Sequence, residues 1–290
     1  MKKLLYLFLA LPMLMNSCSE DEPQRPGIFE GEEIVRDDFD KWLQDNYTKP
    51  YNVDFMYKMK DIEADNKYNL VPADSTKAAK LAIIAKYLWF DAYAEVVGED
   101  FVKANVPRQI HIIGSAAYNS NNTEVLGTAE GGYKVTLYKV NELTDQALTN
   151  YAYLNRIFFH TMHHEFNHIL AQKKPYDPAY GLITKEDYIS GDWYKKSDAE
   201  ALKKGFITPY SMSEYNEDFA EMMSTYVTIT ASEWEAKLRE AGEKATVIKE
   251  KLDMQKKYMM SAWNLDLDKL RDAVLKRGSE LDKLDLSTLK

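Results

Sequence analysis

The chain has one cysteine, Cys18, in 290 residues. A chain with one cysteine cannot form an internal disulfide, so we expect stability to rest on a hydrophobic core, which this length can supply. Basic blocks are also missing, and the net charge is −9, which argues against nucleic acid as a partner. Internal repeats and low-complexity segments are absent as well. The length therefore predicts one large or two small globular domains.

The apolar run at the N-terminus, Leu4 to Met15, is too short to span a bilayer as a mature helix. It follows two lysines and ends just before Cys18, an order that predicts an export signal. The segment Met15-Asn16-Ser17-Cys18 resembles the lipobox of bacterial lipoproteins, although Met15 and Asn16 differ from its commonest form. The resemblance implies that Cys18 becomes the first residue of the mature chain and is acylated. A plain secretory signal with a chance cysteine is the alternative.

Residues 18–35 are expected to form a flexible tether behind a lipoprotein signal peptide at residues 1–17. The tether begins with the acidic segment Ser19-Glu20-Asp21-Glu22, which resembles the surface-export signal of lipoproteins in Bacteroidota-type bacteria. This resemblance implies a lipid-anchored outer-membrane protein that is exposed at the cell surface. The alternative is that the acidic residues are only a solvated spacer.

Histidine is scarce, with five in the chain, yet four of them lie between His160 and His168. This stretch contains the pattern H-E-x-x-H as His164-Glu165-Phe166-Asn167-His168. Residues four apart share one face of a helix, so His164 and His168 can hold one metal ion between them. Glu165 lies about 100° round the helix, where it can reach a water molecule as general base. The pattern predicts the site of a zinc hydrolase with an open coordination position.

The same helix has an apolar side opposite the histidines, formed by Phe158, Phe159, Met162, Phe166, Ile169 and Leu170. One side therefore packs into a core, while the other faces a polar site. His160 shares the face of the two ligands, and we expect it to line the cleft or to support a ligand from behind. The alternative is that His160 closes a structural zinc site as the fourth ligand. We expect a structural role for His163.

Two glutamates recur at helical spacing further along the chain, at Glu217 and Glu221. They share one face of a predicted helix, whose opposite face carries Phe219, Met222, Met223 and Tyr226. This arrangement mirrors the histidine helix. Packed together, the two helices would direct His164, His168 and Glu217 at one place.

The rest of the chain predicts a mixture of helices and strands. Helices are expected at residues 38–47, 77–97, 144–172, 197–204, 232–238, 244–261 and 267–277, with Asn141 or Thr144 as the cap of the third. Strands are expected at residues 51–57, 109–114, 125–130 and 133–139, the last two joined in a hairpin at Gly131-Gly132. This hairpin either offers an edge to an extended peptide or is an ordinary part of a sheet. Residues 173–205 form a long excursion, in which Asp192-Trp193-Tyr194 either line a cleft or cover a loop.

Together, H-E-F-x-H and the segment Glu217-Asp218-Phe219-Ala220-Glu221 resemble the gluzincin class of zinc metallohydrolases. More narrowly, the chain is similar to zinc metallohydrolase lipoproteins associated with substrate import in Bacteroidota. The two motifs also resemble the catalytic domain of the anthrax lethal factor peptidase. The resemblance implies an α+β, zincin-like metallopeptidase fold with a small mixed sheet, an active-site helix and a mainly helical C-terminal part. We expect the catalytic domain at residues 36–230 and a helical extension packed on it at residues 231–290.

The resemblance also implies roles for single residues. Glu217 would complete the binding of one zinc ion per chain, and Glu221 would support a ligand histidine from behind. Tyr210, seven residues before Glu217, would stabilise the oxyanion. The loop before Glu217 is longer than in thermolysin-like peptidases, and if this frame is wrong, Glu221 or Glu214 is the ligand instead.

We therefore expect a surface-anchored, zinc-dependent metallohydrolase that cleaves peptide or glycopeptide bonds, with Glu165 as general base, and serves nutrient uptake. Its partners would be the substrate and an outer-membrane import complex. The alternative is a non-catalytic substrate-binding lipoprotein of such a system, whose zinc site is structural or vestigial. Glu165 and Tyr210 favour the enzyme, because a structural site needs neither. Hydrolysis of a non-peptide bond is a third hypothesis.

Overall fold

The computed structural model describes residues 36–60, 67–119, 123–125, 127–130 and 133–289. The chain divides into two units after Asp37, and the unit from Asp38 to Lys290 holds every element described below. The predicted signal peptide, lipobox and tether, and the predicted turn at Gly131-Gly132, lie outside the described residues. None of the helices in the described ranges combines the length and the apolar character that crossing a bilayer requires.

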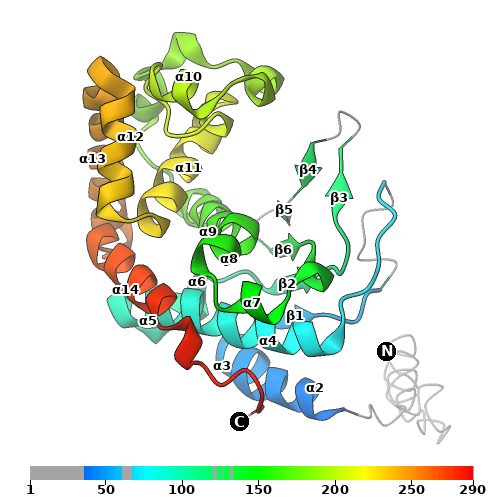
Figure 1. Ribbon diagram of the computed structural model, residues 1–290. Coiled ribbons are helices and arrows are strands. Elements are labelled where there is room, and N and C mark those ends of the chain that lie inside the picture. Colours follow the sequence, from blue (N-terminus) through cyan, green and yellow to red (C-terminus); the bar gives the residue numbers. More distant parts are fainter. Residues whose placement is uncertain (1–35, 61–66, 120–122, 126, 131–132, 290) are drawn as a thin grey trace, which may run out of the picture. The chain divides into compact units, whose positions relative to one another are not determined.

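A four-stranded mixed sheet has the strand order β1-β2-β6-β5 (Figure 1). Its strands are β1 (Asp54–Met56), β2 (Gln109–Ile112), β6 (Lys134–Leu137) and β5 (Gly127–Glu130). The first three run parallel, and β5 pairs with β6 in the antiparallel direction, at the edge of the sheet. A separate pair consists of β3 (Ala117–Tyr118) and β4 (Glu124–Val125). These small sheets within a mostly helical chain confirm the predicted α+β class.

The helices in the first part of this unit are α2 (Asp38–Leu43), α3 (Lys49–Tyr51), α4 (Ser75–Ala85), α5 (Asp91–Val97) and α6 (Glu99–Asn105). The predicted helix at residues 77–97 is present, but the π-helical turn Lys86–Phe90 separates α4 from α5. Gly98 ends it at φ +100°, a conformation that glycine adopts without a steric penalty. The strand expected at residues 51–57 is shorter than predicted, because the chain is still helical as far as Tyr51.

The helix expected at residues 144–172 is broken, so its predicted continuity is wrong. Thr144 caps α7 (Asp145–Leu148), and α8 (Tyr151–Leu154) then starts anew. The break follows from Asn150, whose side chain accepts a hydrogen bond from the backbone of Tyr153 and so starts a separate helix. The π-helical turn Asn155–Phe159 joins α8 to α9 (His160–Lys173), the helix that carries the histidines. Such π turns are frequent near functional sites.

The apolar side of α9 packs into the main core, as its periodicity predicts. Phe166 is buried and meets the rings of Trp89 and Tyr93 edge-on, with centroids 5.4 and 4.9 Å away. Met162 and Leu170 have no exposed surface. The opposite, polar side of α9 is thereby held towards α11 (Tyr215–Thr228).

Short turns occupy the chain between α9 and α11, which includes the excursion predicted at residues 173–205. They are the 3-10 turns Pro178–Leu182, Lys185–Asp187, Ser190–Lys195 and Tyr210–Met212, together with α10 (Asp198–Leu202). A capping box formed by Ser197 and Glu200 starts α10, within the helix predicted at residues 197–204.

The C-terminal helices are α12 (Ala231–Ala241), α13 (Ala245–Trp263) and α14 (Leu267–Ser279), close to the predicted ranges. Figure 1 shows α9 between the sheet and α11, and both α13 and α14 also pack against α11. The Glu-bearing helix is therefore held between the histidine helix and the C-terminal helices.

Candidate metal centre

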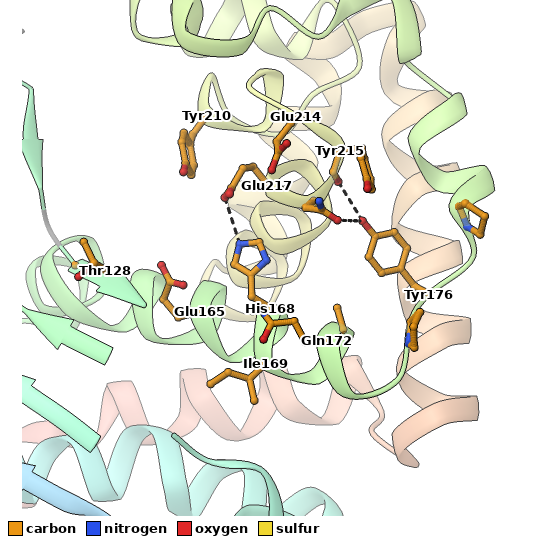
Figure 2. A pocket seen from close by; sticks show the side chains of 15 residues that line it. Thr128, Glu165, His168, Ile169, Gln172, Tyr176, Tyr210, Glu214, Tyr215 and Glu217 are labelled. Atoms are coloured by element: carbon orange, nitrogen blue, oxygen red, sulfur yellow. Dashed lines mark hydrogen bonds and ion pairs between the residues drawn. The ribbon is translucent and has the colours of Figure 1, made fainter. Parts of the chain in front are cut away.

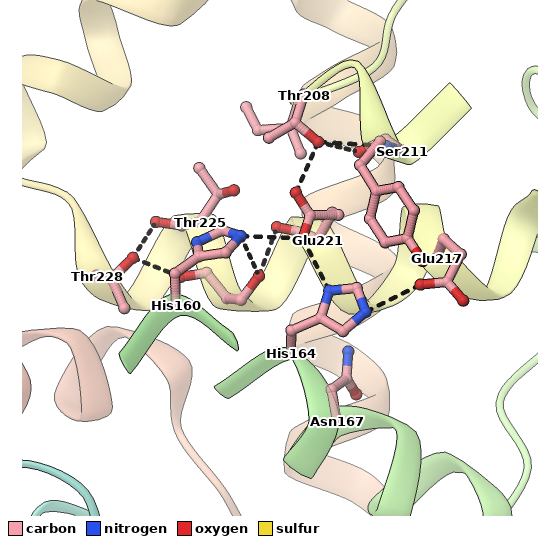
Figure 3. Close-up of polar contacts among 12 residues, drawn as sticks. His160, His164, Asn167, Thr208, Ser211, Glu217, Glu221, Thr225 and Thr228 are labelled. Atoms are coloured by element: carbon pink, nitrogen blue, oxygen red, sulfur yellow. Dashed lines mark hydrogen bonds and ion pairs between the residues drawn. The ribbon is translucent and has the colours of Figure 1, made fainter. Parts of the chain in front are cut away.

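A buried amide fixes α9 to α11. The side-chain nitrogen of Asn167 donates a hydrogen bond of 2.8 Å to the backbone oxygen of Phe219, and Asn167 has no exposed surface. A donor that is buried without a partner would be costly, so this contact favours one relative position of the two helices. Their polar faces meet beside it (Figure 3).

Three ligand-type atoms converge where these faces meet. The Nε2 atoms of His164 and His168 lie 3.0 Å apart. Glu217 Oε2 lies 2.9 Å from the first and 3.3 Å from the second. Within the described part of the chain, this is the one group of histidine, cysteine, aspartate and glutamate side chains with the geometry to hold a metal ion.

The chemistry of this set fits zinc. Glu221 Oε1 lies 2.8 Å from Nδ1 of His164, so this carboxylate would keep a proton on Nδ1 and leave Nε2 to bind a metal ion. His164 Nε2 lies beside a carboxylate oxygen of Glu217, and a cation between the two atoms, either a proton or a metal ion, satisfies both. Tetrahedral zinc, at about 2.0–2.1 Å from nitrogen and oxygen ligands, would place them roughly 3.3 Å from one another. The separations between the three atoms are close to this value.

The charges of the site reinforce one another. Burial alone would lower the pKa of His164, but the carboxylates of Glu217 and Glu221 outweigh it and raise that pKa to about 10. Burial would raise the pKa of Glu217, but the two histidines lower it to about 2. Both shifts mean that the carboxylates create a field in which a positive charge at the histidines is stabilised. A bound metal ion would take the place of that charge.

Glu221 lies behind His164, next to the candidate ligands (Figure 3). Its Oε1 is within hydrogen-bond distance of His164 Nδ1 and also of His160 Nε2, at 2.9 Å. Burial would raise its pKa, but the two histidines hold that pKa well below the ordinary value. The carboxylate therefore stays charged and orients the His164 ring. His160 lies next to this carboxylate and is not part of the group that could hold a metal.

Thr208 is a supporting residue that the sequence analysis missed. Its hydroxyl donates to Glu221 Oε2 at 2.6 Å and accepts from the backbone of Ser211 at 3.2 Å. The two contacts tie the turn that begins at Tyr210 to the buried carboxylate. The only sequence signal was its position two residues before Tyr210.

Glu165 lies on the cavity side of α9. Among the residues that the structure describes, its carboxylate forms no hydrogen bond or ion pair, and it lines a cavity of about 670 Å³ beside His168 and Glu217 (Figure 2). Burial raises its pKa, and His164 and His168 oppose this shift. A carboxylate with a raised pKa and no partner can accept and return a proton.

Tyr210 lines the same cavity, with its ring 5.7 Å from that of His164. Burial, followed by the charges of Glu217 and Glu165, raises the pKa of its hydroxyl, which therefore stays protonated. The ring of Trp193 packs edge-on against Tyr210 at 4.9 Å. Trp193 therefore supports a cavity residue without lining the cavity itself.

His163 has a different environment from the other histidines of α9. It is fully buried, and its Nδ1 lies 2.9 Å from the hydroxyl of Tyr93. Burial lowers its pKa to about 3, so the ring is neutral. The structural role expected for His163 agrees with this position.

A buried ion pair holds α11 on the side away from α9. Lys251 Nζ of α13 lies 2.6 Å from Asp218 Oδ2, and neither side chain has exposed surface. Lys251 also donates to the backbone oxygen of Gly205 at 3.0 Å, and the Tyr188 hydroxyl donates to Asp218 at 3.0 Å. Burial raises the pKa of Asp218 and lowers that of Lys251, so each charge depends on the other.

This pair was not predicted from the sequence. The signal was the position of Lys251, which lies between Ile248 and Leu252 on the buried side of α13. A lysine on an apolar stripe needs a buried partner. Because Asp218 directly follows Glu217, the pair positions the turn of α11 that carries the candidate ligand.

Comparison with known proteins agrees with the chemistry of this site. Residues 32–268 match a family model described as "Putative zinc-binding metallo-peptidase". No curated protein matches the chain. The chain is similar in structure to a protein of Bacteroides caccae, whose crystal structure is described as that of "a putative zinc-binding metallo-peptidase", with 42% sequence identity and a TM-score of 0.77. The similarity covers 91% of this chain and 100% of the other. Since the family model spans most of the sequence, the chain belongs to this zinc-binding metallo-peptidase family.

Proposed function

We propose that this chain is a zinc-dependent peptidase of the gluzincin type. His164, His168 and Glu217 would hold one zinc ion, and Glu165 would act as general base. The observation that carries this proposal is the unpaired carboxylate of Glu165, which lines the cavity beside the three converging ligand atoms. A site that serves structure alone has no use for such a group.

The residues of the cavity suit the hydrolysis of an amide. When bound, zinc lowers the pKa of water and polarises a carbonyl group. Glu165 is placed to accept the proton of the attacking water and to give it to the departing amine. The Tyr210 hydroxyl, which stays protonated, is placed to donate a hydrogen bond to the oxygen of the scissile carbonyl.

The edge strand β5 supports a peptide as substrate. Gly127 and Thr128 of β5 line the cavity, opposite α11 (Figure 2). A Cβ atom at Gly127 would lie 2.6 Å from Cγ2 of Thr161 in α9, so glycine is what lets the strand approach the histidine helix this closely. An edge strand can pair its main chain with an extended peptide, which would lie across the metal site.

The location and partners proposed for the enzyme rest on the sequence. Cys18 would carry a lipid anchor that holds the enzyme at the surface of the outer membrane, where it would cleave peptides or glycopeptides for an import complex. The lipobox resemblance and the acidic segment behind it support this proposal. Incorporation of labelled palmitate that is lost in Cys18→Ala would test it, and equal labelling of both would contradict it.

Zinc content and turnover test the catalytic proposal. The full chain should bind one zinc ion, measured by mass spectrometry of the metal, and should cleave members of a peptide and glycopeptide library. Glu165→Gln should keep the zinc and lose at least about 100-fold in kcat, because proton transfer by a general base contributes this much or more. Zinc without turnover on any substrate would favour the non-catalytic binding protein, and full turnover in Glu165→Gln would show that the base is assigned wrongly.

A further inference from the structure

The N-terminus of α11 has no side-chain cap. Glu214 occupies the cap position in an extended backbone conformation, and its side chain accepts no hydrogen bond from the first turn. Glutamate is not among the residues that favour this position. Some helices start with a side-chain cap, formed by Asp74, Thr144, Asn150, Ser197, Thr230 or Asp266, and others, such as α6 and α13, start without one. The Glu214 side chain is therefore not used to start the helix.

The carboxylate of Glu214 is directed into the cavity instead. Figure 2 shows it on the same wall as Glu217, with Tyr210 to one side and Tyr215 to the other. Glu214 is exposed, and its carboxylate makes no hydrogen bond or ion pair with any residue that the structure describes, whereas its backbone oxygen accepts from the backbone of Asp218 at 3.0 Å. Its charge contributes to the raised pKa of Tyr176, after burial and the charges of Tyr215 and Asp218. The free carboxylate therefore acts on the tyrosine end of the cavity.

This end of the cavity is aromatic and firmly built. The Tyr176 ring stacks on Phe219, with centroids 3.7 Å apart and planes 4° apart. Its hydroxyl donates to Asn216 Oδ1 at 2.9 Å. The second ring, Tyr215, is 46% exposed, so a ligand can reach it. Pro175 and Pro178 line the cavity on the same side.

The charge of the cavity has one sign. Glu165, Glu214 and Glu217 line it, and among the described residues no lysine or arginine does. Under the proposed function, Glu217 serves the metal and Glu165 moves protons, which leaves Glu214 without a role. A carboxylate beside accessible tyrosine rings binds a cation at the end of an apolar stem, through a charge-assisted hydrogen bond and contact with the ring face.

We infer that Glu214 is a specificity-determining residue, which selects peptides that carry an ammonium or guanidinium group next to the scissile bond. The group is either a lysine or arginine side chain or the free amino terminus of the substrate. The inference rests on the proposed function, because it assigns a substrate class to the same cavity. In this role Glu214 does not bind the metal ion.

Binding to an inactive enzyme tests the inference without turnover. The probes are matched peptides that contain lysine or norleucine, and arginine or citrulline, at the same position, each with a free or an acetylated amino terminus. Binding to the zinc-loaded, full-chain Glu165→Gln protein is measured by calorimetry. We expect the cationic peptide of a pair to bind about tenfold more tightly than its neutral partner.

Second variants identify the residue responsible. In Glu165→Gln/Glu214→Gln, the ratio of the affinities of the cationic and the neutral peptide should fall to nearly one. In Glu165→Gln/Glu214→Lys, the preference should reverse, so that glutamate-containing peptides bind more tightly. The matched control is Glu165→Gln/Glu235→Gln, because Glu235 is exposed on α12 and does not line the cavity. Zinc content is measured for each protein to show that it is folded.

The outcomes separate this inference from the proposed function. A preference that follows the acetylation of the amino terminus identifies the terminus as the cation, and one that follows lysine or arginine identifies the side chain. Equal binding of charged and neutral partners, or a preference that survives both substitutions of Glu214, overturns the inference even if the wild type cleaves peptides. A Glu214-dependent preference in a protein that cleaves none of the peptides overturns the proposed function and leaves the binding site standing.

Discussion

The two ends of the cavity are built from different kinds of structure. At the metal end, the candidate ligands and their supporting carboxylate come from two regular helices, α9 and α11, and their polar atoms are mutually bonded. At the other end, the wall includes Pro175, Tyr176 and Pro178, which lie between α9 and α11 in the excursion of short turns, and the carboxylate of Glu214 has no bonded partner among the described residues. Paired helices fix atoms to the accuracy that chemistry needs, whereas loops can vary and so suit the choice of substrate.

The largest effect should come from the ion pair that holds α11. Lys251→Met leaves the charge of Asp218 buried without its partner, which typically costs about 3–5 kcal/mol of folding free energy. Urea denaturation of the full chain measures the loss. The control Lys249→Met, an exposed position on the same helix, should change stability by less than about 0.5 kcal/mol. Equal stability of the two variants would show that the pair does not hold α11.

The second largest effect should come from the loss of the proposed oxyanion donor, Tyr210. Tyr210→Phe removes the hydroxyl that lines the cavity at the metal end, and we expect a fall in kcat of about 100-fold to 1000-fold with zinc retained. Steady-state kinetics on a cleaved peptide measure it. Tyr118→Phe is the control, since Tyr118 is 58% exposed and lies outside the cavity lining. A change in KM alone would move Tyr210 from the chemistry to substrate binding.

A smaller effect is expected behind the metal. Glu221→Gln removes the charge that orients His164, and such supporting contacts are worth about 10-fold to 100-fold in metal affinity. Competition with a chelator of known affinity measures the change, with Glu235→Gln as the exposed control. Complete loss of zinc would instead identify Glu221 as a ligand, which is the other frame that the sequence left open.

The smallest effect on stability should come from Thr208, which connects the turn at Tyr210 to Glu221. Thr208→Val keeps the shape of the side chain and removes the hydrogen bond to Glu221, at a cost of about 1–2 kcal/mol in stability. Thermal unfolding measures it. The control Thr246→Val changes an exposed threonine of α13. If Thr208→Val were as stable as this control, the turn at Tyr210 would be held by other contacts.

The part of the site that lies on helices could be predicted, because the relevant geometry is local. The spacing of four between His164 and His168, and between Glu217 and Glu221, fixes which side chains share a face, and the apolar residues opposite fix which face is buried. The structure brings His164, His168 and Glu217 together as this phasing predicts. Their roles as ligands remain a prediction that zinc content tests.

The other parts of the site depend on contacts between residues that are distant in the sequence, and hydrophobic periodicity does not predict such contacts. Thr208 meets Glu221 across 13 positions, and Tyr176 meets Asn216 across 40, from turns with no regular repeat. Local competition explains the broken helix before the site: the Asn150 side chain bonds the backbone of Tyr153 and restarts the helix that hydrophobic spacing alone would continue. The class and the order of elements were therefore predictable, but the walls of the cavity were not.

The ion pair between α13 and α11 couples the stability of the C-terminal helices to metal binding. If zinc binds only the folded chain, its binding free energy adds to the free energy of every local unfolding event that destroys the site. Asp218, next to Glu217, loses its partner Lys251 whenever α13 detaches, so the amides of α13 should exchange with deuterium more slowly when zinc is present. A segment that contributes no ligand would thus report, by its exchange rate, whether the ion is bound.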